Sequence, residues 1–131
     1  MALYRVMKGA DAWEYEGKGH YNCKATRLHT FDDFEGGKLT MGLTHFFPAK
    51  DGQPGGGAYV RQAAFEMIYY VKKGNLTIIT ADEETDDPAK MTRHDLVEGD
   101  SIRFMPGACR GIDNVSDEIV QMLVVMIVEK H

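Results

Sequence analysis

The sequence predicts an all-β protein built as a sandwich or barrel of short strands. No segment of about ten or more residues has the hydrophobic periodicity of an amphipathic helix. Short segments rich in β-branched and aromatic residues instead recur at roughly 8–12-residue intervals, separated by Gly, Asn, Asp and Pro. The 131 residues are enough for one domain with its own core. We therefore expect a single β domain covering residues 1–131, without internal repeat or linker.

The N-terminal third contains the least regular elements. Residues 3–7 alternate apolar and polar side chains and are predicted to form a strand. Residues 9–19 carry three acidic residues and three glycines and are predicted to form a loop. Residues 21–29 are extended, but neither face is clearly apolar, which is typical of a strand at a sheet edge or a dimer contact. The Asp-Asp-Phe-Glu-Gly-Gly sequence that follows predicts a turn.

Residues 38–47 show a clear alternation and are predicted to form a strand. The apolar members of this alternation share one face with a histidine, and we expect that face to point into the core. They are Leu39, Met41, Leu43, His45 and Phe47. The segment 48–58 then contains two prolines and four glycines. It is predicted to be a long flexible loop, placed where it could cover a barrel mouth.

Residues 65–71 form the most strongly β-prone segment of the chain. Phe65, Met67, Tyr69 and Val71 make the more apolar of its two faces, so we expect them to point inward. A Gly-Asn turn leads to a second strand at 76–80. The acidic segment 81–90 has no EF-hand spacing and is predicted to be a solvated hairpin tip. Two short strands are expected between residues 95 and 107.

The segment 119–128 is apolar on both faces apart from Gln121. A strand of this kind is either central in a sandwich or covered by a partner subunit. This pattern is one of two reasons to predict a homodimer. The other is the family resemblance described below.

Bulk properties exclude several classes of function. The net charge of −5 argues against general nucleic-acid binding, which needs a basic face to neutralise phosphates. No apolar run is long enough to cross a bilayer, and no secretory signal pattern opens the sequence. The two cysteines do not form a disulfide framework, so a reduced cytoplasmic location is the simplest expectation. Free cysteines are more often buried apolar residues than redox-active ones, so we expect both cysteines to be buried and not to form a redox pair.

Two segments resemble the signature motifs of the cupin family. GGGAYVRQAAFEMIYYVKKG, residues 55–74, is similar to G-x5-H-x-H-x3-E-x6-G, and GDSIRFMPGACRGIDN, residues 99–114, is similar to G-x5-P-x-G-x2-H-x3-N. The resemblance covers roughly residues 36–128 and implies a cupin-like jelly-roll β-barrel, preceded by N-terminal strands and a loop at 1–35. It also implies a dimer. In metal-dependent cupins, three histidines and one glutamate of these motifs hold a divalent ion.

The metal-ligand positions of the motifs hold other residues here. They fall on Arg61, Ala63, Met67 and Arg110. Divalent metals require imidazole, thiolate or carboxylate donors, and a guanidinium repels a cation. We therefore expect neither a metal nor another cofactor at this site.

Arginine in place of a metal favours an anionic ligand. A guanidinium can bind a carboxylate through two parallel hydrogen bonds, and Phe65, Met67 and Phe104 would line the site with apolar surface. The sequence therefore predicts that Arg61 and Arg110 bind a small carboxylate-bearing molecule. In the alternative interpretation, Arg61 points to solvent and Arg110 pairs with an acid at the rim such as Asp113.

His45 and Tyr69 are the predicted catalytic residues. A histidine on the apolar face of its strand would lie in a partly desolvated barrel and could transfer protons near neutral pH. Tyr69 could donate a proton or a hydrogen bond to an oxyanion. The alternatives are a hydrogen-bonded core histidine and an aromatic side chain that only fills the core.

Three functional hypotheses remain open at this point. The first is a metal-independent lyase, isomerase or decarboxylase acting on a small carboxylate-bearing metabolite, as the resemblance to metal-free sugar-nucleotide epimerases of this superfamily allows. The second is a non-catalytic binder of such a metabolite. The third is a metalloenzyme whose ligands come from His20, His29 and His45.

Overall fold

The computed structural model describes residues 3–128, and both ends of the predicted domain range lie just outside them. Within this range the chain forms two antiparallel sheets and three short 3-10 turns, and no helix is long and apolar enough to cross a membrane. The strands are β1 (Trp13–Tyr15), β2 (His20–Tyr21), β3 (Cys23–His29), β4 (Leu39–Phe46), β5 (Gly57–Gln62), β6 (Glu66–Lys73), β7 (Leu76–Ala81), β8 (Thr92–Leu96), β9 (Ser101–Phe104), β10 (Cys109–Asp113) and β11 (Val120–Ile127). The 3-10 turns are η1 (Gly9–Asp11), η2 (Phe31–Asp33) and η3 (Pro88–Lys90).

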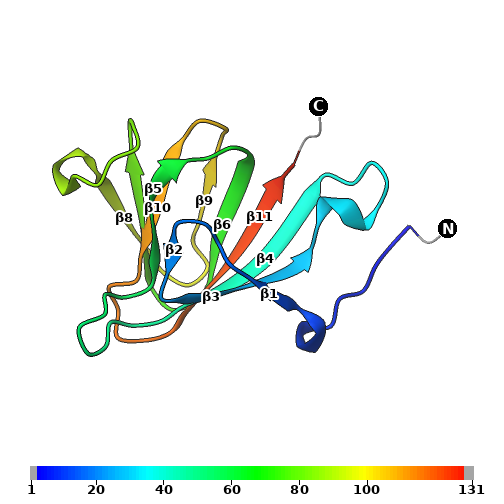
Figure 1. Cartoon of the computed structure of the whole chain (residues 1–131), viewed down its shortest axis with the longest axis horizontal. Coiled ribbons are helices and arrows are strands. Elements are labelled where there is room, and N and C mark those ends of the chain that lie inside the picture. Colours follow the sequence, from blue (N-terminus) through cyan, green and yellow to red (C-terminus); the bar gives the residue numbers. More distant parts are fainter. Residues whose placement is uncertain (1–2, 129–131) are drawn as a thin grey trace.

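The two sheets face each other, and the chain passes repeatedly from one to the other (Figure 1). The first sheet has the order β1-β3-β4-β11-β6-β9, and the second has the order β2-β5-β10-β7-β8. This crossing pattern is that of a jelly roll, in which each strand buries one face against the opposite sheet. The predicted all-β jelly-roll class is confirmed.

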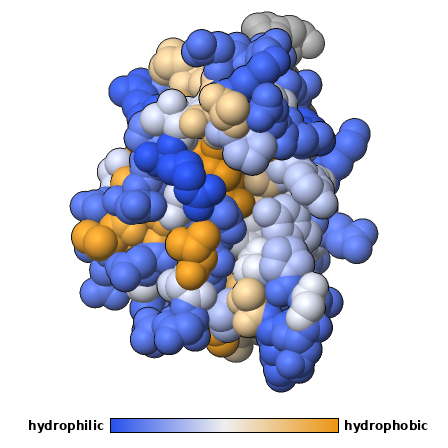
Figure 2. Space-filling view, turned by 90° about the vertical axis from the view of Figure 1, so that its left-hand side faces the viewer, coloured by the Kyte–Doolittle hydropathy of each residue, from blue (hydrophilic) through white to orange (hydrophobic). Residues whose placement is uncertain are grey.

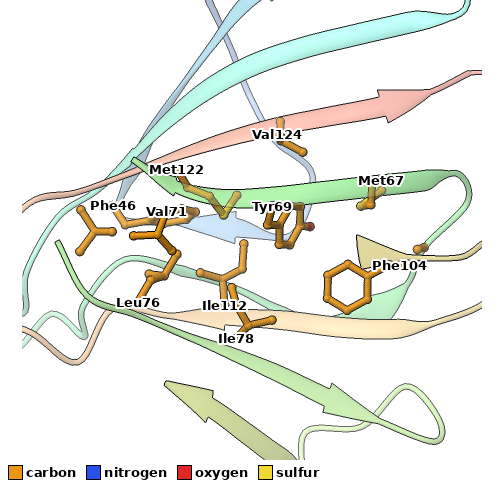
Figure 3. Packing of buried hydrophobic residues seen from close by; sticks show 12 residues of the cluster. Phe46, Met67, Tyr69, Val71, Leu76, Ile78, Phe104, Ile112, Met122 and Val124 are labelled. Carbon is orange, nitrogen blue, oxygen red and sulfur yellow. The ribbon is translucent and has the colours of Figure 1, made fainter. Parts of the chain in front are cut away.

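The core fills the space between the sheets along the length of the barrel. Phe46, Val71 and Leu76 lie together at one end, and Met67 and Phe104 lie at the other (Figure 3). The first three side chains are at most 2% exposed. We call their end of the barrel the closed end and the other the open end.

The inward face of β6 follows the prediction. Met67, Tyr69 and Val71 are buried, while Ile68 and Tyr70 of the same strand are about two-fifths exposed at 41% and 42%. Phe65 lies just before the strand and is half-buried. The strand predicted at 76–80 is β7, and the acidic segment after it is mostly exposed, as expected.

The inward face of β4 is the opposite of the predicted one. Phe46 is fully buried, and Thr40, Gly42 and Thr44 share its face. The pairing with β11 fixes this orientation, because Phe46 lies opposite buried Val120. Leu39, Met41, Leu43 and His45 therefore lie on the outer face of the sheet. The apolar alternation identifies a real face, but it is the outer one.

The N-terminal segment differs from the prediction in two places. Residues 3–8 form no strand, and Arg5 instead attaches this segment to the barrel by donating from Nη1 to the carbonyl oxygen of Leu28 at 3.0 Å. The same nitrogen lies 3.2 Å from Asp33 Oδ2. The predicted loop 9–19 contains the edge strand β1, whose three residues pair with β3.

The extended segment 21–29 is divided between the two sheets. Asn22 has a left-handed φ of 45°, and the chain changes direction there. β2 joins the edge of the second sheet, while β3 lies inside the first sheet between β1 and β4. Only the β2 part is therefore at a sheet edge, as predicted.

The loop at 48–58 does not cover the open end of the barrel. The side-chain amide of Asn22 donates to the carbonyl oxygens of Pro48 and Pro54, at 3.4 and 3.0 Å. The backbone nitrogen of Asn114 donates to the carbonyl oxygen of Gly56 at 2.8 Å. These contacts hold the loop near Phe46, at the closed end, so the predicted position over a mouth is wrong.

Candidate functional site

Arg110 and Tyr69 form the centre of the candidate site. Arg110 is on β10, and its Nε donates to the hydroxyl oxygen of Tyr69 at 3.1 Å, while Nη1 donates to the carbonyl oxygen of Arg61 at 2.8 Å. Its side chain thus points toward the inner face of β6. Arg110 belongs to none of the ion pairs formed by the described residues. The rim acid Asp113 pairs with Arg93 instead, at 3.0 Å.

Tyr69 is held as a neutral phenol. Burial raises the pKa of its hydroxyl, and the charge and hydrogen bond of Arg110 only partly oppose this. Since Arg110 already donates to the hydroxyl oxygen, the O–H hydrogen remains available for another acceptor. Phe104 packs edge-on against the Tyr69 ring, with 5.4 Å between ring centroids. The predicted inward positions of Met67, Tyr69 and Phe104 are therefore correct.

Arg61 does not join Arg110 in the barrel. Its Nη1 donates to the carbonyl oxygen of Val60 at 2.7 Å and lies 3.5 Å from Asp86 Oδ1. The Arg61 side chain is 47% exposed. The guanidinium thus turns to the acidic hairpin tip at the rim. Its predicted inward position is wrong, because a partner acid is available outside.

His45 lies on the outer face of β4, and this removes the inward position on which its predicted catalytic role rested. It faces Lys24 across β3 and Gln121 across β11. Burial lowers the pKa of His45, and the positive charges of Lys24 and Lys72 lower it further. Its Nδ1 is buried without a hydrogen-bond partner among the described residues.

The three histidines of the alternative metal site do not come together. Within residues 3–128, no group of three or more His, Cys, Asp or Glu side chains is arranged to hold a metal ion. His45 is on the outer face, and His29 Nδ1 lies 3.0 Å from Arg5 Nη1. The signature positions do not fit a metal either, because Ala63 and Met67 offer no hard donor and Arg110 is a cation.

From the sequence, His20 was expected only as a possible metal ligand, and its place at the lining of a pocket was not predicted. It lines a pocket of about 580 Å³ between β1, β2 and β3. Its Nδ1 lies 3.2 Å from the carbonyl oxygen of Lys18 and therefore donates to it, which leaves Nε2 as an acceptor. Burial lowers the pKa of His20, carbonyl contacts from Lys18 and Gly17 oppose this, and the charge of Arg110 lowers it further.

Tyr15 and Arg27 complete the inner surface near this pocket. Tyr15 lines the pocket together with Ala25, its cross-strand partner on β3. Arg27 is the next inward residue of β3, and its guanidinium carbon lies 4.0 Å from the centre of the Tyr15 ring. The alternation along residues 21–29 groups Arg27 with Ala25. It could not show that this face was the inner one, because the face is not apolar.

Charged side chains of both signs line the pocket. Glu16 and Lys18 are exposed there, so their opposite charges face solvent. The charge of Arg110 lowers the pKa of His20 and opposes the effect of burial on the pKa of Tyr69. The contacts near this pocket form two pairs, Arg110 with Tyr69 and Arg27 with Tyr15.

Several solved structures are similar to this chain along most of its length. The polyketide cyclase RemF from Streptomyces resistomycificus aligns with a TM-score of 0.73 at 15% identity, over 97% of this chain and 81% of that one. A predicted oxalate decarboxylase from Thermotoga maritima aligns with a TM-score of 0.72 at 14% identity, over 95% of this chain and 100% of that one. An RmlC-like cupin from Shewanella frigidimarina aligns with a TM-score of 0.63 at 14% identity, over 100% and 95%.

These likenesses show that the chain has the cupin fold. No protein-family model matches the sequence, and no curated protein matches it significantly. The fold expected from the two signature segments is confirmed. Because all three identities lie near 15%, fold similarity alone does not assign the chemistry of the barrel.

Proposed function

We propose that this chain binds a small carboxylate-bearing metabolite inside the barrel, at Arg110 and Tyr69. The observation that carries the proposal is the set of hydrogen-bond partners of the Arg110 guanidinium. It donates to a neutral hydroxyl and a backbone carbonyl, and no acidic side chain of the described residues pairs with it. A guanidinium has five N–H donors, so some of them remain for a ligand.

The surroundings of Arg110 support a carboxylate over other anions. Planar bidentate pairing suits a guanidinium and a carboxylate, and the Tyr69 hydroxyl can add a further hydrogen bond. Met67 and Phe104 lie on the same inner surface and offer apolar contact to the body of the ligand. A separate pocket of about 580 Å³, lined by residues 15–23 and Ala25, includes His20, and its volume lies within the range of small-molecule sites.

Acid–base catalysis on the bound acid is a second candidate, favoured by His20. A neutral imidazole with a free Nε2, whose pKa the charge of Arg110 helps to lower, has the properties of a general base. It would replace His45 in the role of proton carrier for a lyase, isomerase or decarboxylase. Two structural neighbours, a polyketide cyclase and a predicted oxalate decarboxylase, are consistent with enzymatic use of this fold.

Hexanoate and the neutral hexanamide form a matched pair of probes for the binding proposal. We expect hexanoate to perturb the NMR signals of Arg110 and Tyr69 and to bind more tightly than hexanamide. Arg110→Gln should weaken hexanoate binding about tenfold or more, since a charge-assisted pair is lost. Arg103→Gln is the matched control, because Arg103 is exposed and pairs with Glu66. Equal binding of hexanoate and hexanamide would contradict the proposal.

The catalytic candidate has a separate test. 2-Oxobutanoate is an enolisable carboxylate, and NMR in D2O measures the exchange of its C3 protons. The wild-type protein should accelerate this exchange, and His20→Asn should abolish the acceleration while leaving the affinity for the acid within about threefold. If the wild-type protein binds the acid without accelerating exchange, the binding proposal stands and the catalytic one is dropped.

A further inference from the structure

Arg27 is a half-buried cation, and one nitrogen of its guanidinium, Nη1, is buried without a hydrogen-bond partner among the described residues. The guanidinium carbon lies 4.0 Å from the centre of the Tyr15 ring. Burying a guanidinium N–H without an acceptor is costly, and one cation–π contact offsets only part of that cost. An acceptor on a bound ligand would satisfy this nitrogen.

The location of Arg27 is the inner surface of the first sheet. Ala25 precedes it on the same face and is 5% exposed. Gly42 is its cross-strand partner on β4 and contributes no side chain to that face. A Cβ at Gly42 would point to Val124 Cγ1 at 3.5 Å, and Val124 belongs to the core. Arg27 therefore starts from the interior side of the sheet, next to the pocket that Tyr15 and Ala25 line.

Arg27 and Arg110 each contact a tyrosine of the first sheet. The Tyr15 ring contacts Arg27, and the Tyr69 hydroxyl contacts Arg110. Arg27 pairs with Gly42 across β4, Gly42 with Val124 across β11, and Val124 with Tyr69 across β6. Arg27 and the tyrosine that binds Arg110 therefore lie in one cross-strand row of the inner surface. Two guanidinium groups placed in this way complement a molecule with an acidic group at each end of an apolar body.

We propose that Arg27 is a second anion-binding residue and that the ligand of this barrel is a diacid. One carboxylate pairs with Arg110 and Tyr69, and the other pairs with Arg27 above the Tyr15 ring. This inference rests on the proposed function and narrows it to dicarboxylates. It also assigns Arg27 and Tyr15 to the binding site, to which the cupin signature segments do not extend.

The test compares diacids with monoacids of equal carbon number. The probes are succinate, adipate and suberate, set against butanoate, hexanoate and octanoate, with affinity measured by calorimetry or NMR titration at one ionic strength. At the best-fitting length, we expect the diacid to bind about tenfold more tightly than its monoacid, because a second charge-assisted pair forms. Arg27→Met should remove this preference, so that the diacid and its monoacid bind with affinities within about twofold of each other.

The outcomes separate this inference from the proposed function. Monoacid binding that depends on Arg110, together with no diacid preference at any length, would overturn the diacid inference alone. Failure of all six probes to bind would overturn both. A diacid preference that survives Arg27→Met would also overturn the role of Arg27.

Thermal unfolding without ligand gives a second readout. A residue kept for stability lowers the Tm when it is replaced. Arg27→Met removes the buried Nη1 that lacks a partner and keeps an unbranched side chain, so the Tm should not fall. Ala25→Met, which forces a large side chain onto the same buried face, is the comparison that should lower the Tm. A drop for Arg27→Met as large as that for Ala25→Met would contradict a ligand-binding role.

Discussion

At the scale of single residues, His45 and Arg61 were predicted in the barrel and lie elsewhere, for different reasons. Arg61 is on a strand face that points inward, but its side chain is long enough to reach Asp86 at the rim. His45 is on the outer face from its backbone onward. The position of Arg61 depends on an acid that is distant in sequence, which periodicity cannot show. The position of His45 depends on which of the two strand faces is buried.

His45 should make the stability of the protein pH-dependent. Burial and the charges of Lys24 and Lys72 lower its pKa in the folded state below the ordinary histidine value of 6.5. The unfolded chain therefore binds a proton more readily as the pH falls. The contribution of neutral His45 to the free energy of unfolding is present above pH 6.5 and is lost as the pH falls through the lowered pKa.

Two measurements check this prediction. An NMR titration should give His45 a pKa below 6.5, and His45→Gln should flatten the decline of the free energy of unfolding in mild acid. Lys72→Gln is a matched variant, since it removes one of the charges and should raise the pKa of His45. A His45 pKa at or above 6.5 would show that the histidine is solvated.

At the scale of secondary structure, turns and strand positions were predicted better than strand faces. The glycine and asparagine turns of the two signature segments fix the order of β5 to β10. On β6 the more apolar face is the buried one. On β4 it is the reverse, because small residues face the interior and the larger apolar ones face outward. Alternation identifies two faces, and only pairing with β11 shows which one is inside.

The site residues that sequence reasoning missed lie on elements with weak periodicity. β1 and β2 have three and two residues, too few for an alternation to be recognised. β3 carries Ala25 and Arg27 on its inner face, a pair that resembles an exposed surface. A buried face that includes an arginine cannot be distinguished from a solvated one by hydropathy. Arg110 and Tyr69 could be predicted because a motif fixed their positions.

Asn114 should be a major contributor to the stability of the closed end. It follows β10, is 1% exposed, and its side-chain nitrogen donates to the carbonyl oxygens of Phe46 and Glu118 at 3.1 and 2.9 Å. Its Oδ1 accepts from the backbone nitrogen and the hydroxyl of Ser116, at 3.0 and 2.6 Å. This side chain connects β10, β4 and the turn into β11.

Replacing Asn114 by alanine leaves these buried groups without partners. We expect Asn114→Ala to lower the free energy of unfolding by about 2–4 kcal/mol, measured by urea denaturation. Asn75→Ala is the control, because Asn75 is exposed in the β6–β7 turn, and should change stability by less than about 0.5 kcal/mol. Similar values for the two variants would mean that water replaces the Asn114 bonds at little cost.

At the scale of the whole molecule, the apolar residues are unevenly distributed over the surface. The face on the β8 side is mostly hydrophilic, with separate hydrophobic areas (Figure 2). The outer face of the first sheet is different. Leu43, Leu123 and Tyr70 lie side by side across β4, β11 and β6. Further apolar residues extend this row toward one end of the strands: Leu39, Met41, Ile68, Val125 and Ile127.

This outer face is the surface on which we expect a second copy of the chain to dock. Leu39 is 59% exposed, and Ile68 and Tyr70 are 41% and 42% exposed. A contiguous apolar sheet face of this kind marks an interaction site in soluble proteins. A homodimer would bury it with a self-complementary contact, and a stable one needs about 800 Å² from each partner. It would also explain why the larger apolar residues of β4 point away from the core.

Leu123 is the residue at which to test the dimer, because it is central in the row and half-buried in the single chain. Light scattering at micromolar concentration should give twice the chain mass of 14.7 kDa for the wild-type protein. Leu123→Glu places a charge in the middle of the contact and should raise the dimer Kd about 100-fold or more, because burying an unpaired carboxylate is costly. Val97→Glu is the matched control: Val97 is 53% exposed and follows β8 in the other sheet, so its dimer should persist. A monomeric wild-type mass would contradict the prediction, and a dimer that survives Leu123→Glu would move the interface to another face.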